Sequence, residues 1–98
     1  MLYERVEVWK RLAEGSVVCF QCVKRLPDGM FAVQSADFFH PPASKVQVAG
    51  SHNQFAELMM EDDPSVRTEL WRMSLEEAVA AHEEHFAPMW DSIRLATF

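Results

Sequence analysis

The chain has 98 residues, of which 49% are hydrophobic and 24% charged, and a net charge of −6 at pH 7. This size and composition indicate one globular domain, residues 1–98, and exclude a disordered tail. The charge is uneven: residues 50–98 carry three Lys/Arg against ten Asp/Glu, whereas residues 1–49 carry six against five. Such a surface repels nucleic-acid backbones and anionic membranes, so we expect neither as a partner.

No apolar run approaches the roughly 20 residues that a membrane-spanning helix needs. The first residues, MLYERVE, are already charged and patterned, unlike a signal peptide, so we expect a cytoplasmic protein. Cys19 and Cys22 stand three apart in a predicted strand and therefore point to opposite faces. We expect both thiols to be reduced and buried.

The first half of the chain predicts an antiparallel meander of three strands. The strands are residues 3–12, 17–23 and 30–39. The second strand is almost all β-formers, as is typical of a strand covered on both faces. Leu26–Met30, which contains Pro-Asp-Gly, predicts the hairpin turn between the last two. With Leu26 opposite Met30, Val23 faces Val33 and Cys19 faces Asp37.

Residues 55–61, FAELMME, are compatible with two structures. Counted from Phe55, the apolar residues share one face of a helix; counted from Ala56, they alternate as in a strand. The acidic pair Asp62-Asp63 would be unfavourable at the negative end of a helix dipole. Together these observations favour a fourth strand over a helix for residues 55–61.

The clearest helix begins at Ser74, which forms a capping box with Glu77. Its apolar face recurs at steps of four, three and four residues: Leu75, Val79, His82 and Phe86. Pro88 is expected to end it. We therefore predict an α+β fold, in which a three- or four-stranded antiparallel sheet has one main helix, about residues 74–86, packed on one face.

Two stretches, Phe31–Phe39 and Trp71–Ala78, resemble small uncharacterised bacterial single-domain proteins. Those proteins have a strand meander followed by a helix that starts W-x-x-S-L-E-E-A, and the resemblance spans most of residues 3–86. The motifs are structural. The resemblance implies a bacterial α+β domain and no particular activity.

Patterns for catalysis or metal binding are weak. His82 and His85 stand one residue closer than the zincin motif requires, and Cys19-x-x-Cys22 lacks a second pair of ligands. The chain has no glycine-rich phosphate loop and no nucleophile elbow. We therefore expect no catalytic residues, no metal and no cofactor. A metal- or cysteine-dependent enzyme is the least favoured function.

Two binding sites are predicted instead. One is a small pocket between sheet and helix, lined by Gln34, Asp37, Trp71 and His82. The other is an acidic face that suits a basic protein: Asp62, Asp63, Glu76, Glu83 and Glu84.

Large apolar side chains are abundant for a domain of this size, with three Trp, seven Phe and six Met, and the tail 89–98 is apolar as well. This surplus predicts an interface. We expect a non-enzymatic accessory or binding protein that works through protein contacts, either as a homodimer or by neutralising a basic partner. The alternative is a module that binds a small hydrophobic or cationic ligand.

Overall fold

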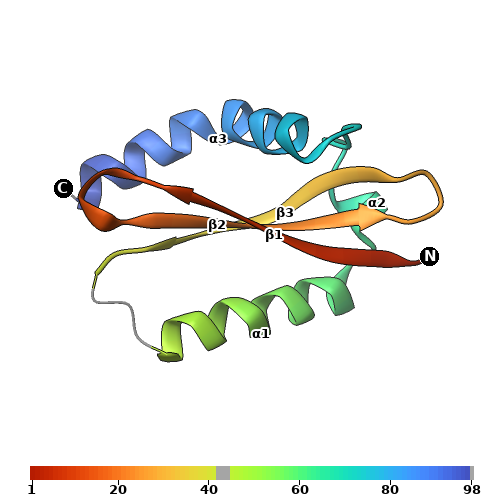
Figure 1. Cartoon of the computed structure of the whole chain (residues 1–98), viewed down its shortest axis with the longest axis horizontal. Coiled ribbons are helices and arrows are strands. Elements are labelled where there is room, and N and C mark those ends of the chain that lie inside the picture. Colours follow the sequence, from red (N-terminus) through yellow and green to blue (C-terminus); the bar gives the residue numbers. More distant parts are fainter. Residues whose placement is uncertain (42–44, 98) are drawn as a thin grey trace.

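A computed structural model describes residues 1–41 and 45–97, with side chains for 1–41 and 49–86. A three-stranded antiparallel sheet, in the order β1-β2-β3, lies between helix α1 on one face and helix α3 on the other (Figure 1). The elements are β1 (Tyr3–Arg11), β2 (Val17–Arg25), β3 (Met30–Phe39), α1 (Lys45–Glu61), α2 (Pro64–Arg67) and α3 (Leu75–Thr97), with a short 3-10 segment at Ala13–Gly15. The α+β prediction is confirmed.

The central strand β2 is buried on both faces, as its composition predicts. On the α3 side, the core consists of Val18, Phe20, Cys22, Val33 and Ala78. On the α1 side, β2 contributes Cys19, Gln21 and Val23, each 1% exposed. Burial on both faces explains why nearly every residue of this strand is a β-former.

The hairpin loop between β2 and β3 is one residue longer than predicted. Arg25, not Leu26, pairs with Met30. The loop closes with Gly29, which has a φ of 69° and donates its N–H to the Arg25 carbonyl at 2.7 Å. A left-handed residue at this position suits glycine because other side chains are strained there.

A β-bulge corrects this shift farther along. Gln34 is the extra residue, since Val33 pairs with Cys22 while Ser35 pairs with Gln21. Before the bulge, the predicted pairing of Val23 with Val33 is wrong, because Val23 faces Ala32. After the bulge, the predicted pairing of Cys19 with Asp37 is confirmed.

The predicted fourth strand is wrong, because residues 55–61 form the last part of α1. Phe55 is half-buried and Ala56 exposed, so the helical face inferred from the sequence is the one that packs. One residue of the acidic pair belongs to the next element: Asp63 caps α2 and accepts a hydrogen bond from the Ser65 N–H at 2.9 Å. A carboxylate at a helix N-terminus is favourable.

Helix α3 begins as predicted, with the Glu77 N–H donating to Ser74 Oγ at 3.1 Å. It does not end before Pro88, as we predicted, but continues to Thr97. A proline inside a helix removes one backbone hydrogen bond and leaves the others available. The predicted packing of the 89–98 side chains lies outside the described residues. Within the described part of the chain, no helix is long and apolar enough to cross a membrane.

Candidate functional site

Strand β1 forms one edge of the sheet. Two hydrogen bonds just beyond its ends show which of its residues direct their backbone N–H and C=O groups toward β2. Leu26 N–H donates to the Leu2 carbonyl at 3.0 Å, and Leu12 N–H donates to the Ser16 carbonyl at 2.8 Å. Backbone groups alternate in direction along an antiparallel strand. The even-numbered residues of β1 therefore bond to β2, and the odd-numbered ones direct their N–H and C=O away from the sheet. Those residues are Tyr3, Arg5, Glu7, Trp9 and Arg11.

The opposite edge, along β3, is partly closed. Phe31 and Arg72 exchange two backbone hydrogen bonds of 2.8 Å, so residue 72 caps the start of that edge. The bulge at Gln34 then interrupts the regular spacing of the strand. Bulges and short covering segments are two of the ways in which proteins protect an edge from pairing. Of the two edges, β1 is the one with nine regular residues and no partner among residues 1–41 and 45–97.

The side chains along the β1 edge are mixed in character. Trp9 is 51% exposed and lies 5.9 Å from the Phe39 ring, between centroids. Arg5 and Glu7 form an ion pair of 2.5 Å on the α1 face of the sheet, and His52 on α1 lies 3.4 Å from the same carboxylate. The outward-directed residues of this edge therefore combine an exposed tryptophan with two positive charges and one negative charge.

A polar chain, buried at Gln21 and Ser51, runs beneath α1, and nothing in the sequence predicted it. It consists of Arg5, Gln21, Ser51 and Asp37. Arg5 Nε donates to Gln21 Oε1 at 3.0 Å, Gln21 Nε2 donates to Ser51 Oγ at 3.3 Å, and Ser51 Oγ donates to Asp37 Oδ2 at 2.5 Å. Gln21 is 1% exposed, so its amide depends on these partners. The polar chain fixes α1 on the sheet.

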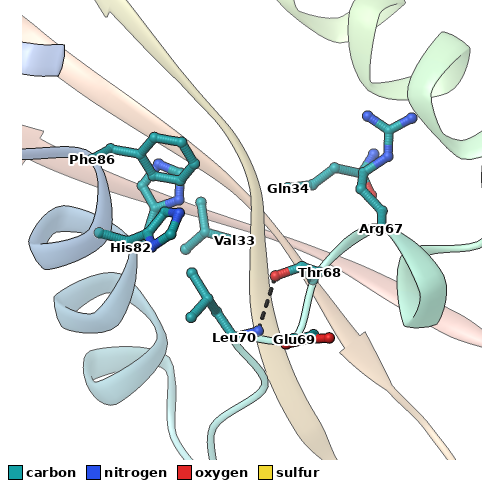
Figure 2. A pocket seen from close by; sticks show the side chains of 9 residues that line it. Val33, Gln34, Arg67, Thr68, Glu69, Leu70, His82 and Phe86 are labelled. Atoms are coloured by element: carbon teal, nitrogen blue, oxygen red, sulfur yellow. Dashed lines mark hydrogen bonds between the residues drawn. The ribbon is translucent and has the colours of Figure 1, made fainter.

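A cleft of about 360 Å³ crosses the outer edge of β3 (Figure 2). Its lining residues are Val33, Gln34, Arg67, Thr68, Glu69, Leu70, His82, His85 and Phe86. Figure 2 shows Gln34 and Arg67 on one side of the strand and Val33, His82 and Phe86 on the other. Gln34 Oε1 and Arg67 Nε are buried and have no hydrogen-bond partner among the described residues. Such atoms are expensive to leave unpaired.

The structure brings together two of the four residues predicted for a pocket, Gln34 and His82. Asp37 lies apart, in a second cleft of about 340 Å³ that also contains Ser51. Trp71 lines neither cleft: it stacks on Tyr3 at 6.3 Å and lies under the Arg25 guanidinium at 4.3 Å. The four residues therefore do not form one site.

No protein-family model, curated protein or solved structure matches the chain. Function is therefore inferred from the geometry of the chain itself.

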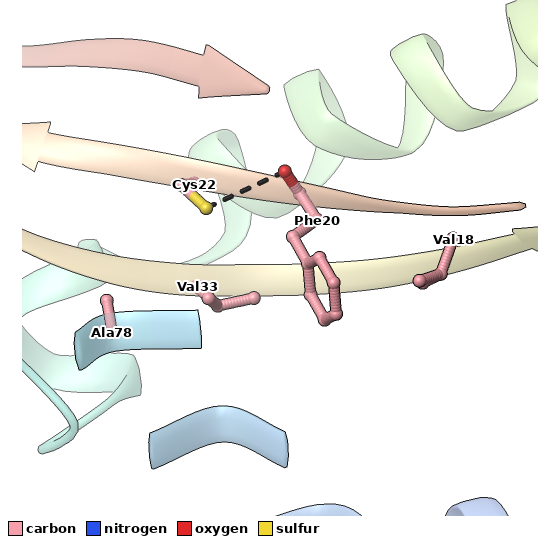
Figure 3. Close-up of a cluster of buried hydrophobic side chains, with 5 residues drawn as sticks. All are labelled: Val18, Phe20, Cys22, Val33 and Ala78. Carbon is pink, nitrogen blue, oxygen red and sulfur yellow. Dashed lines mark hydrogen bonds between the residues drawn. The ribbon is translucent and has the colours of Figure 1, made fainter. Parts of the chain in front are cut away.

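The two thiols are poor nucleophiles. Burial, together with the Glu7 and Asp37 carboxylates, raises the pKa of Cys19 to about 11. Burial, with Cys19 nearby, raises the pKa of Cys22 to about 12. Figure 3 shows Cys22 within the core, its Sγ directed at the Phe20 carbonyl at 3.6 Å. A reactive cysteine needs the opposite environment, one that stabilises the thiolate.

His82 is a core residue with a polar ring. It is 8% exposed and lies edge-on to Phe20, with 6.0 Å between ring centroids. Burial, followed by the neighbouring charge of His85, lowers its pKa.

Among the described residues, no three His, Cys, Asp or Glu side chains form a group suited to a metal ion.

The predicted acidic residues are divided between two places. Asp62 and Asp63 lie at the end of α1, whereas Glu76, Glu83 and Glu84 belong to α3 across the sheet (Figure 1). Three of them already have partners: Asp63 accepts from the Tyr3 hydroxyl, Asp62 lies 3.5 Å from Arg67, and Glu83 pairs with Lys10 at 2.8 Å. The Tyr3 hydroxyl also lowers the pKa of Asp63.

Proposed function

We propose that this protein is a non-enzymatic binding protein that acts through protein contacts, and that its β1 edge binds a second copy of the chain. The observation that carries the proposal is the open edge. A regular strand of nine residues presents the N–H and C=O groups of five residues outward, without partners among the described residues. An exposed edge of this kind is a template for adding another strand.

Apolar exposure at the same edge supports this proposal. Trp9 is 51% exposed and Leu2, just before β1, is 71% exposed. A strand added along β1 would cover both. Burial of apolar surface contributes roughly 25 cal/mol per Å², so an interface here gains stability from side chains as well as from backbone bonds.

Neutralisation of a basic partner has weaker support. The acidic residues lie on opposite sides of the sheet, and Asp62, Asp63 and Glu83 already have partners within the chain. A single basic surface would therefore meet only part of the set at one time. Catalysis has weaker support still, because both thiols are held in their protonated form.

Light scattering coupled to gel filtration tests self-association. The expected result is a dimer at high micromolar concentration, and a monomer under those conditions would overturn the proposal.

The variant Glu7→Pro tests whether β1 is the interface. The Glu7 N–H points away from β2, so proline at this position leaves the sheet of one copy intact and blocks the added strand. We expect this variant to be a folded monomer. Glu4→Ala, at an exposed residue of β1 whose backbone bonds to β2, is the control and should remain a dimer.

The cleft at β3 favours a second candidate function, the binding of a small uncharged molecule. Gln34 Oε1 is an unpaired acceptor and Arg67 Nε an unpaired donor, and Phe86 supplies an aromatic wall. The Gln34 amide orientation is supported by its Nε2, which donates to the Phe55 carbonyl at 3.5 Å. A planar lactam, which presents N–H and C=O side by side, matches these two groups.

Titration of the protein with 2-pyridone, followed by amide chemical shifts, tests this candidate. Saturable shifts at residues 33–34, 67–70 and 82–86 are expected. N-methyl-2-pyridone, which lacks the N–H, should bind more weakly, and Arg67→Lys, which lacks Nε, should weaken 2-pyridone binding. Equal binding of both compounds, or no saturable shift, would exclude the lactam site.

A further inference from the structure

We infer that two copies pair through β1 in one particular register, with Val6 of one copy facing Val6 of the second copy across a two-fold axis. This inference rests on the proposed self-association and specifies its geometry. In this register, Arg5 faces the second copy's Glu7, and Tyr3 faces the second copy's Trp9.

Symmetry restricts the possible arrangements. Two copies of one strand that pair antiparallel in a continuous sheet are related by a two-fold axis perpendicular to that sheet. The axis keeps each face on its own side, so both copies of α1 cover one face and both copies of α3 the other. Odd-numbered residues of β1 must then face odd-numbered residues, because these direct their backbone groups outward and share a face.

Under these constraints, the axis passes through one residue of β1, and five central positions, Arg5 to Trp9, pair at least five residues of each strand. An axis at Arg5 places two guanidinium groups opposite each other. An axis at Glu7 places two carboxylates opposite each other, and an axis at Val8 sets Arg5 against Arg11. Like charges directly opposite across strands are destabilising. An axis at Trp9 sets Glu7 against Arg11 but pairs only five residues of each strand. Only an axis at Val6 pairs seven residues of each strand, places opposite charges together and sets no like charges opposite each other.

The Val6 register extends contacts that already exist within one copy. Arg5 and Glu7 form an ion pair 2.5 Å long on the surface of the monomer, with side chains 32% and 28% exposed. In the dimer the two pairs become a square of alternating charges. Charge networks of this kind contribute more than isolated surface pairs.

Side chains at the centre and ends of the interface also match. Val6 packs against the α3-side core from the edge of the sheet. At the axis it occupies a non-hydrogen-bonded pair, the closer of the two pair types, so the second copy's Val6 continues that core. On the other face, Tyr3 covers the exposed Trp9 ring, and aromatic cross-strand pairs are favourable.

Engineered cysteines distinguish the registers. Val6→Cys places two thiols at the axis, within the range for a disulfide, and should cross-link under mild oxidation. Val8→Cys is the matched control: it lies on the same face and is also half-buried, but it is four residues from its symmetry mate along the strand. It should not cross-link, and neither should Glu7→Cys. Cys19 and Cys22 are buried, and the parent protein shows whether they react.

Charge reversal gives an independent measurement. Glu7→Arg should raise the dimer dissociation constant by about tenfold or more, because each Arg5 then faces an arginine. The double variant Arg5→Glu/Glu7→Arg restores opposite charges and should restore most of the affinity. Circular dichroism checks that each variant is folded.

The outcomes separate the two proposals. A parent protein that remains a monomer at high micromolar concentration removes both. A dimer that cross-links through Val8→Cys or Glu7→Cys, and not through Val6→Cys, keeps self-association and overturns the register. A dimer that none of the three variants cross-links excludes axes at Val6, Glu7 and Val8, and so also overturns the register.

Discussion

The Ser51 hydroxyl on α1 donates to the Asp37 carboxylate on β3, with 2.5 Å between Ser51 Oγ and Asp37 Oδ2. The same hydroxyl oxygen accepts from Gln21 Nε2 at 3.3 Å. One small side chain therefore satisfies a carboxylate and a buried amide from two different strands. This contact explains why a carboxylate is tolerated near the end of an otherwise apolar strand.

Ser51→Ala should destabilise the fold. It removes the donor to Asp37 and the acceptor of Gln21, and leaving a buried polar group unpaired costs about 1–3 kcal/mol. The higher helix propensity of alanine offsets up to about 0.5 kcal/mol. Urea denaturation measures the difference. Asn53→Ala, at an exposed position of the same helix, is the control and should leave the free energy of unfolding unchanged or slightly raised. Equal effects of the two substitutions would mean that the polar chain contributes nothing.

The thiols should be nearly inert in the folded protein. A pKa of about 11 for Cys19, against 9.0 for a free thiol, lowers the thiolate fraction at neutral pH about 100-fold, and burial slows the reaction further. The measurement is the rate of alkylation by iodoacetamide in buffer and in denaturing urea. Reaction should be fast and complete at both cysteines in urea. Rapid modification of either one in the folded state would contradict the raised pKa values of these thiols.

The sequence predicted most of the sheet, because strands and turns carry strong local signals. Pro27-Asp28-Gly29 marked the hairpin, and Ser74 marked the start of α3. The error in the register arose from Gln34, since a bulge depends on the fit of two whole strands and has no signature in one of them. The pairing of Cys19 with Asp37 was correct because the bulge and the longer hairpin loop, one residue more than predicted, offset each other.

Helix α1 was missed for a different reason. Residues 55–61 satisfy both a helical and a strand pattern, and the acidic pair was assigned to the wrong element. Asp63 stabilises the start of α2, where a carboxylate is favourable. The β1 edge was also missed, because a strand at an edge and a strand in the interior differ in their neighbours. Sequence patterns report which face is buried and say little about which backbone groups remain unpaired.

Acid should weaken the fold between neutral pH and the lowered pKa of His82. Burial lowers the pKa of this ring in the folded protein, so the unfolded chain binds the proton more readily. Stability from the neutral ring is therefore complete above the ordinary histidine pKa of about 6.5 and is lost as the pH falls below it. His82→Gln removes this titration. Denaturation curves collected from about pH 7.5 to 5 should show a smaller loss of stability in the variant than in the parent. Parallel losses would show that His82 does not contribute.

Two glycine substitutions should change the free energy of unfolding in opposite directions. A Cβ built at Gly29 or at Gly50 meets no atom within 4 Å, so neither change creates a clash and each reports on the backbone alone. Gly29 has a φ of 69°, and alanine there should cost about 1 kcal/mol, because L-residues are strained in this region. Gly50 lies inside α1, where alanine should stabilise by about 0.5–1 kcal/mol.

Urea denaturation of both variants, with the parent as reference, checks this pair. Gly29→Asn is the control for the turn, since asparagine tolerates the left-handed region better than alanine and should lose less stability. The result at Gly50 also bears on α1 directly. If residues 45–61 were extended, alanine at position 50 would bring no gain in helix propensity, so destabilisation by Gly50→Ala would contradict the helix assigned there.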